Sequence, residues 1–262
     1  MSFFPLCNVL NTSGFCTLHN FSPNNWEKIK PSNKTIWALH SDGEKWITKE
    51  LDILQKGKSK TYYYDDFDLK KENNVSPIVL LQFRKTPLLS NLDSLPLHEF
   101  IFSKTPEWRA TVGFQLNKSQ TSYQGEINPF PRKASLLTFH PFIQFKEVNN
   151  NLIFLNVEQS PIHRKAEIEI YNAETKILLD KVCVKSNHVN VIPLDKYGFK
   201  PNKLPLFICK TMAGIPFGFG ISNKKNMLSM EHTHPPASFV IHGKRFLVQK
   251  KIKQNWFDLL NA

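Results

Sequence analysis

The residues best suited to metal or proton chemistry gather near the C-terminus, between positions 227 and 243. They are Glu231, His232, His234 and His242. In an extended chain, His232 and His234 project to the same face. Two imidazoles in that arrangement suit zinc or iron, or acid–base chemistry without a metal. We therefore take these four residues as catalytic candidates, with His232 and His234 as the candidate metal ligands.

The spacing of His232 and His234 is similar to the His-x-His of cupin barrels, in which a glutamate follows the pair. Here Pro235 and Pro236 follow, and the one local acid, Glu231, precedes the pair and alternates with it. A metal would need a carboxylate from another part of the chain. The alternative interpretation is a polar strand end before a rigid proline turn.

A second group of side chains suits ligand binding, because exposed aromatic rings stack on sugar rings or nucleobases and cations pair with carboxylates or phosphates. This group predicts recognition of a glycan or a similar polar ligand, although aromatic rings serve equally well in a core. Its members are Trp37, Trp46, Trp108, Arg109 and Tyr123.

Two smaller groups of reactive side chains are better explained by a structural role than by a catalytic or metal-binding one. Cys16 and His19 are too close in sequence for a usual nucleophile–base pair, which joins distant parts of a chain. Asp65, Asp66 and Asp68 lack the glycine and final glutamate of a calcium loop, and a solvated turn explains them.

The composition indicates a globular protein rich in β structure. Hydrophobic residues make up 41% and charged residues 21%, and 21 Phe and 17 Pro stand against 10 Gly. The net charge is +12, and Lys and Arg outnumber Asp and Glu most strongly after residue 222. A basic segment of this kind is compatible with an anionic partner such as nucleic acid. The four cysteines form no Cys-x-x-Cys pair, so a reduced, cytoplasmic chain is expected.

The N-terminal half, residues 1–133, is predicted to form an irregular antiparallel β domain. Residues 1–34 look loop-like, whereas 35–40 and 44–48 around Ser41-Asp42-Gly43 predict a hairpin. A short helix is expected near 88–97. The prolines at 129 and 131 mark the predicted domain boundary.

Residues 134–222 predict an immunoglobulin-like β-sandwich, because short strands alternate with turn residues. Residues 165–171 alternate strictly, with Ala166, Ile168 and Ile170 on the inner face. A turn is expected at 148–151. Residues 223–262 are predicted to hold the histidine segment and an amphipathic helix, whose apolar line is Val248, Ile252, Trp256 and Leu259.

The leading hypothesis for function is a non-catalytic binding or accessory protein for a glycan or similar polar ligand. The alternatives are a metal-dependent or histidine-based enzyme acting on a carbohydrate-like substrate, and a nucleic-acid-associated module. Possible zinc or iron is the one cofactor indicated. No signal peptide or transmembrane segment is apparent, and the sequence does not define the oligomeric state.

Overall fold

The computed structural model describes residues 3–20, 33–69, 75–96, 110–139, 147–199, 205–232 and 244–260. The protein is mainly β and antiparallel with a C-terminal helix, as predicted from the sequence, and the described ranges hold four sheets and one α-helix. In the part of the chain that is described, no helix is long and apolar enough to cross a membrane.

The N-terminal half contributes two sheets. Sheet I has the order β1-β7-β3-β4-β8, with β1 Phe4–Leu6, β7 Val79–Arg84, β3 Lys34–Ser41, β4 Trp46–Leu54 and β8 Asn91–Leu92. Sheet II has the order β10-β9-β2-β5, with β10 Ser119–Gly125, β9 Ala110–Leu116, β2 Ser13–His19 and β5 Ser59–Tyr63. A 3-10 turn, η1 Tyr64–Asp66, follows β5.

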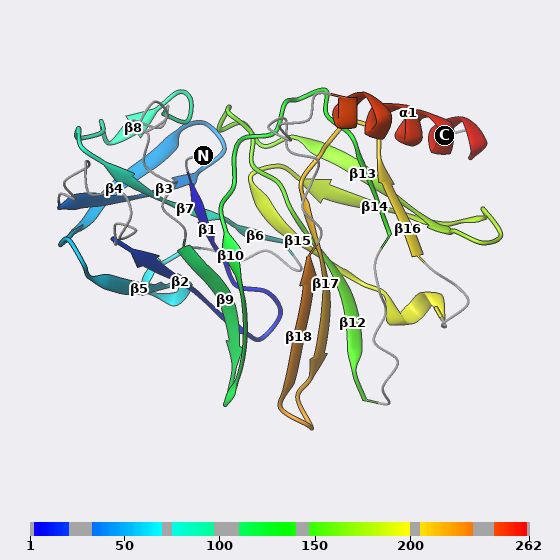
Figure 1. Ribbon diagram of the computed structural model, residues 1–262, viewed down its shortest axis with the longest axis horizontal. Coiled ribbons are helices and arrows are strands. Elements are labelled where there is room, and N and C mark those ends of the chain that lie inside the picture. The colour runs from blue at the N-terminus through cyan, green and yellow to red at the C-terminus, as the bar shows by residue number, and fades with distance from the viewer. Residues whose placement is uncertain are drawn as a thin grey trace.

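The C-terminal half contributes every strand of the other two sheets except β6 (Figure 1). Sheet III has the order β18-β17-β12-β15-β6, with β18 Met227–His232, β17 Ile215–Ser222, β12 Asn149–Leu155, β15 His188–Pro193 and β6 Val75–Pro77. Sheet IV has the order β11-β16-β13-β14, with β11 Leu136–Phe139, β16 Pro205–Cys209, β13 Lys165–Asn172 and β14 Leu178–Lys185. A 3-10 turn, η2 Asp195–Tyr197, follows β15.

Sheet III is apolar on both faces and joins the two halves. One face contributes Phe217 and Phe219 to the core that fills sheets I and II, and the Phe219 ring meets Phe114 of β9 edge-on at 5.5 Å. The other face contributes Leu152 and Phe154 to the core shared with sheet IV. Because side chains alternate along a strand, successive residues of β12 contribute in turn to one core and then to the other.

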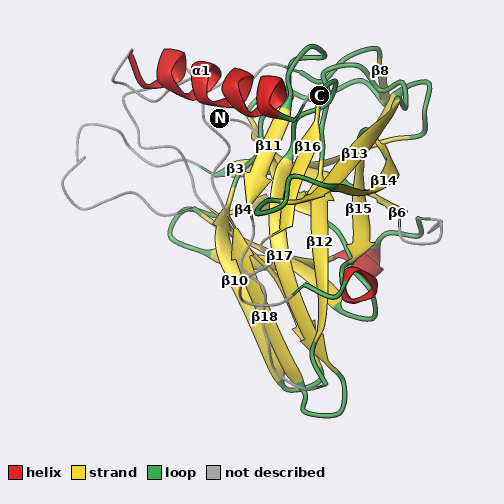
Figure 2. Cartoon of the chain, turned by 90° about the vertical axis from the view of Figure 1, so that its right-hand side faces the viewer, coloured by secondary structure: helices red, strands yellow, loops and turns green. Residues whose placement is uncertain are grey.

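The C-terminal helix α1, Lys244–Leu259, covers the outer side of sheet IV beside β11 and β16 (Figure 2). Trp256 and Phe257 pack there with Leu206 and Ile208 of β16. The predicted apolar line is only partly right, because Ile252 and Leu259 are each 49% exposed. The packed face includes Phe257 in place of those two.

Several local predictions are confirmed by the strands. The hairpin at 41–43 joins β3 to β4, and β13 buries Ala166, Ile168 and Ile170. Other predictions are wrong. Residues 3–19 hold β1 and β2, residues 88–96 contain the two-residue strand β8 in place of a helix, and the Asn149–Asn151 run lies inside β12. Hydrogen bonding to neighbouring strands overrides the turn preference of asparagine.

The immunoglobulin-like arrangement is not confirmed. Residues 134–222 do form two facing sheets, but sheet III also recruits β6 from the N-terminal half and β18 from beyond residue 222. Strand pairing between residues more than 100 positions apart has no local sequence signal. The predicted boundary near residue 133 remains a prediction.

Candidate functional site

Sheet II presents a continuous outer face of polar, uncharged side chains. Its inner residues, such as Cys16, Leu18 and Val112, enter the core, so the alternate residues face outward. The outward set is Gln120, Ser122 and Gln124 on β10, Thr111, Gly113 and Gln115 on β9, Ser13, Phe15, Thr17 and His19 on β2, and Ser59, Thr61 and Tyr63 on β5. None of these outward residues is Lys, Arg, Asp or Glu, in a chain of net charge +12, although the Asp65 carboxylate accepts the Ser13 hydroxyl at 2.8 Å at the margin of the face.

Much of this outer face is open to solvent. The three β10 side chains and Gln115 beside them are exposed, and Tyr63 at the other margin is 43% exposed. Thr17, Thr61 and Thr111 between these margins are half-buried. Solvent therefore reaches hydroxyl and amide groups on all four strands.

Hydrogen bonds across the strands hold the centre of this face. The Thr17 and Thr61 hydroxyls are 2.8 Å apart. The His19 ring lies between two hydroxyls, with Nδ1 2.8 Å from Ser59 Oγ and Nε2 3.2 Å from Thr111 Oγ1. These cross-strand contacts position the side chains without help from a ligand.

The middle of the face contains an apolar inset. A side chain at Gly113 would place its Cβ 2.5 Å from Cζ of Phe15 and 2.4 Å from the Thr121 carbonyl oxygen. The Phe15 ring therefore occupies the space above Gly113, and it is 5% exposed. The Phe15 ring fills the space that a side chain at position 113 would otherwise occupy.

Of the five predicted ligand-binding residues, Trp37, Trp46 and Tyr123 belong to the part of the chain that the structure describes. Trp37 and Trp46 are 7% and 1% exposed, and the Trp46 indole N–H donates to the Gln159 carbonyl at 3.1 Å. The Tyr123 ring packs on Phe217 with a centroid distance of 5.0 Å, and burial raises the pKa of its hydroxyl well above 10. These three rings pack within the protein and present no open face to a ligand. Trp108 and Arg109 lie outside the described residues.

The histidine segment is described only at its start. The β18 backbone places His232 opposite Phe217, and Glu231 is exposed beside a hollow of about 180 Å³ that Asn150, Ser229 and the glycines of β17 line. His234 and His242 lie outside the described residues. Within the described ranges, no three His, Cys, Asp or Glu side chains group to hold a metal ion.

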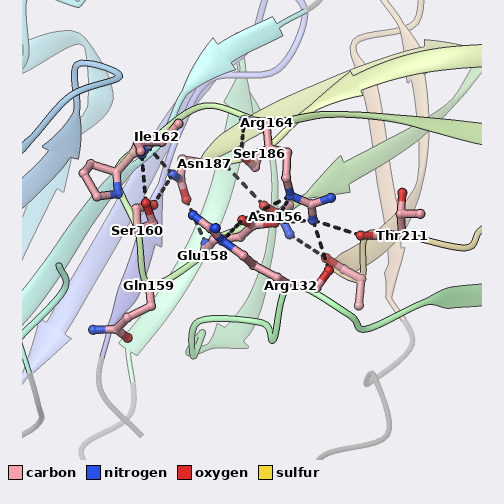
Figure 3. A network of polar contacts seen from close by, with 12 residues as sticks. Arg132, Asn156, Glu158, Gln159, Ser160, Ile162, Arg164, Ser186, Asn187 and Thr211 are labelled. Carbon is pink, nitrogen blue, oxygen red and sulfur yellow. Dashed lines mark hydrogen bonds and ion pairs between the residues drawn. The ribbon is translucent and has the colours of Figure 1, made fainter.

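A buried polar network lies where residues 156–164 meet the turn at 186–187 (Figure 3). Glu158 is 1% exposed, and its Oε1 accepts from Arg164 at 2.6 Å and 3.1 Å. Asn187 accepts the Glu158 backbone N–H at 2.7 Å and donates to the Ser160 carbonyl at 2.9 Å. The Glu158 carboxylate is thus fully paired by its neighbours, and it stabilises the contact between residues 156–164 and the turn at 186–187.

Beside this network, Ser41 and His163 have the residue types of a nucleophile and its base. Ser41 Oγ lies 2.9 Å from His163 Nε2, but it also lies 2.5 Å from the Pro161 carbonyl, which only accepts. The single hydroxyl hydrogen therefore goes to Pro161, and His163 must donate to the hydroxyl. An imidazole that donates cannot remove the serine proton, so the pair links residues 41 and 163 structurally.

A hollow of about 310 Å³ opens on the edge of the second pair of sheets. Val182 and Cys183 of β14, Val191 of β15, and Lys196 and Tyr197 of η2 line it. The Lys196 ammonium and the Tyr197 hydroxyl both donate to Asp180, at 2.8 Å and 2.6 Å. The polar groups of Lys196 and Tyr197 at the rim of this hollow are therefore already hydrogen-bonded within the protein.

The chain matches no protein-family model, no curated protein and no solved structure. The argument for function consequently depends on the geometry of the described surfaces.

The outer face of sheet II was not predicted, because residues 1–34, which contain β2, look loop-like in sequence. The signal was present as a period-two pattern. In β2, Gly14, Cys16 and Leu18 alternate with outward polar residues, and in β10 the outward residues are Gln120, Ser122 and Gln124. Alternation that places hydroxyls and amides outward, without charges, marks such a face.

Proposed function

We propose that this protein is a non-catalytic binding protein for a neutral glycan or a similar polyhydroxylated ligand, taken up on the outer face of sheet II. The observation that carries the proposal is the four-stranded array of outward hydroxyl and amide groups with an exposed Tyr63 and no charged residue among them, Asp65 lying only at the margin beside Ser13. Sugar hydroxyls donate and accept hydrogen bonds, as Ser, Thr and Gln side chains do. The apolar side of a sugar ring stacks on an aromatic ring such as that of Tyr63.

The same chemistry disfavours other partners for this face. Nucleic acid is held mainly through Lys and Arg contacts to phosphate, and the face has neither residue. A stable protein interface has an apolar, aromatic centre, whereas the exposed positions here are mostly polar. A neutral ligand rich in hydroxyl groups satisfies the face without burying an unpaired charge.

The test is calorimetric titration of the protein with neutral oligosaccharides, preceded by a screen on a glycan array. Tyr63→Ala is expected to weaken binding about tenfold or more, because a stacked ring contributes roughly 1–3 kcal/mol. The pair Gln115→Ala and Gln120→Ala, which face each other on β9 and β10, should weaken it further. Affinity should change little between about 0.05 and 0.5 M salt, since no phosphate contacts are broken.

Two surface variants serve as matched controls. Leu89→Ala removes a 75% exposed apolar side chain, and Gln55→Ala removes an exposed amide, both outside sheet II. Both should bind as the unaltered protein does. The proposal is overturned if no neutral oligosaccharide binds, or if Tyr63→Ala retains full affinity while its fold is intact.

A further inference from the structure

The open positions on the outer face of sheet II lie in two groups at opposite margins. Gln120 and Ser122 are exposed on β10, and Tyr63 is 43% exposed on β5. Gly113 and Phe15 stand between Ser122 and Tyr63 in the same cross-strand row, and both are buried. A ligand that contacts both margins must therefore pass over the middle of the face, where the side chains are less exposed.

A row of threonine hydroxyls connects the two margins. Thr111, Thr17 and Thr61 are paired in register across β9, β2 and β5, and each is half-buried. The Thr17 and Thr61 hydroxyls are 2.8 Å apart, and one donates to the other, so the accepting hydroxyl keeps its hydrogen for a further bond. We call these three residues the threonine row, which offers donors and acceptors on successive strands.

The width of the face sets a minimum length for a ligand that reaches both margins. Neighbouring strands lie about 4.8 Å apart, so the three gaps from β10 to β5 make about 14 Å. A single sugar ring covers one or two strands, whereas a chain of linked sugars covers all four. The regular spacing of the threonine row also favours a ligand that repeats at a similar interval.

A β-1,4-linked chain of pyranose sugars has the shape and the chemistry that these positions require. Its equatorial linkages keep the chain extended as a ribbon, whereas an α-1,4 linkage turns each sugar and coils the chain. C–H groups cover the broad faces of the rings and stack on an aromatic ring such as that of Tyr63, while hydroxyls project from the edges of the ribbon. The Asp65 carboxylate beside Ser13 disfavours an anionic chain, which leaves the neutral class.

We propose that the ligand of this face is an extended, neutral β-1,4-linked oligosaccharide that lies across the strands, from Tyr63 on β5 to Ser122 on β10, above the threonine row. The inference rests on the proposed function of sheet II and adds the linkage, the length and the direction of its ligand. One sugar stacks on Tyr63, and the following sugars bond to the threonine row and then to the β10 side chains.

Calorimetric titration with β-1,4-linked oligomers of glucose, mannose or xylose, from the monosaccharide to the hexasaccharide, tests the length and the linkage. For at least one of these sugars, affinity is expected to rise with each added residue until the chain spans the four strands, and then to level off. α-1,4-linked glucose oligomers of the same lengths should bind about tenfold more weakly or not at all, because a coiled chain leaves the face.

Variants at the two margins test the direction of the chain. Gln120→Ala combined with Ser122→Ala should weaken binding of the tetrasaccharide about tenfold and leave the disaccharide, which is held at Tyr63, unchanged. Tyr63→Ala should weaken both, and Gln55→Ala, which removes an exposed amide outside sheet II, should weaken neither. Circular dichroism and the melting temperature check each fold. If the double variant does not fold, Ser122→Ala alone decides the question.

A disaccharide that binds as tightly as the tetrasaccharide, or an α-linked series that binds as well as the β-linked one, overturns this inference while the proposed function stands. An equal loss for both lengths in the double variant on β10 overturns the direction across the strands. If no neutral oligosaccharide of any linkage binds, the proposed function fails and this inference fails with it.

Discussion

Glu158 shows how a single residue fixes the joint between distant segments. A buried carboxylate is tolerated only when its charge and lone pairs are satisfied. Arg164 supplies the charge and two close hydrogen bonds, and the Arg132 Nε lies 3.9 Å from the second oxygen. A further hydrogen bond joins the same two segments, since the Asn187 backbone N–H donates to the Asn156 side-chain oxygen at 3.2 Å.

We expect Glu158→Gln to lower the free energy of unfolding by about 1–3 kcal/mol, because Arg164 loses its buried partner. Urea unfolding measures the change. Asp93→Asn is the control, since the Lys45–Asp93 pair is exposed and Asp93 is 87% exposed. It should alter stability by less than about 1 kcal/mol. Equal effects in the two variants would contradict the role assigned to Glu158.

The four cysteines should differ sharply in reactivity. Cys7, Cys16 and Cys209 are buried, and burial raises the pKa of the Cys7 thiol to about 12, whereas Cys183 is exposed. Thiolates, not thiols, react with disulfide reagents. We expect the native protein to consume one equivalent of a chromogenic disulfide and the unfolded protein four. Cys183→Ser should abolish the native reaction; a remaining fast reaction would contradict the burial.

At the scale of elements, β14 is an outer strand whose exposed edge is partly blocked. The Lys181 backbone N–H donates to its neighbour Asp180 at 2.8 Å, and the Lys185 N–H donates to the Asn190 side chain at 2.8 Å. Side chains thus occupy donors that another chain's strand would use. Such capping protects a sheet from edge-to-edge pairing.

Asp180 also ties β14 to η2, which makes the contact sensitive to acid. Hydrogen bonds from Lys196 and Tyr197 lower the pKa of its carboxyl from 3.8 to about 2. A depressed pKa stabilises the fold above pH 4, and that contribution is lost as pH falls from about 4 to 2. Because the Asp180 side chain is 34% exposed and solvent screens its charge, the effect should stay below about 1 kcal/mol.

We therefore expect Asp180→Asn to remove part of the pH dependence of stability between about pH 4 and pH 2, and to change little in high salt. Denaturant unfolding at several pH values measures this. Tyr197→Phe removes one of the two donors and should shift the transition towards pH 4 only in part. An unchanged pH profile in Asp180→Asn would refute the assignment.

At the scale of the molecule, sheet III belongs to both cores. Phe217 and Ile153 pack with the N-terminal sheets, while Leu152 and Phe154 pack with sheet IV. In addition, β6 leaves the N-terminal half to pair with β15. The core of the N-terminal half is therefore completed by one face of sheet III, whereas sheets III and IV enclose a core made of C-terminal residues alone.

This shared sheet predicts one cooperative unfolding transition. Scanning calorimetry should give a single peak whose calorimetric and van't Hoff enthalpies agree. A fragment ending at residue 133 should not fold, because it exposes the apolar face that Phe217 and Phe219 cover. Two separate transitions, or a folded fragment, would support the two-domain division predicted from the sequence.

Local pattern in the sequence was sufficient for the mainly β class, for the β3–β4 hairpin and for the inner face of β13. Period-two alternation and an Asp-Gly turn act over a few residues, so they are visible without the fold. The C-terminal helix was equally visible from its period, although its packed face was not.

The tertiary structure alone decided which side chains meet. Trp37 and Trp46 were candidates for a binding face, with the core as the open alternative, because an aromatic residue in a strand suits both. Both are buried, since burial depends on what covers the strand. The polar outer face of sheet II arises from strands whose paired residues, such as Ser13 and Gln115, lie more than 100 positions apart in the chain. Each strand contributes only a few hydroxyls or amides. Registers between distant strands are set by packing, and no local sequence signal records them.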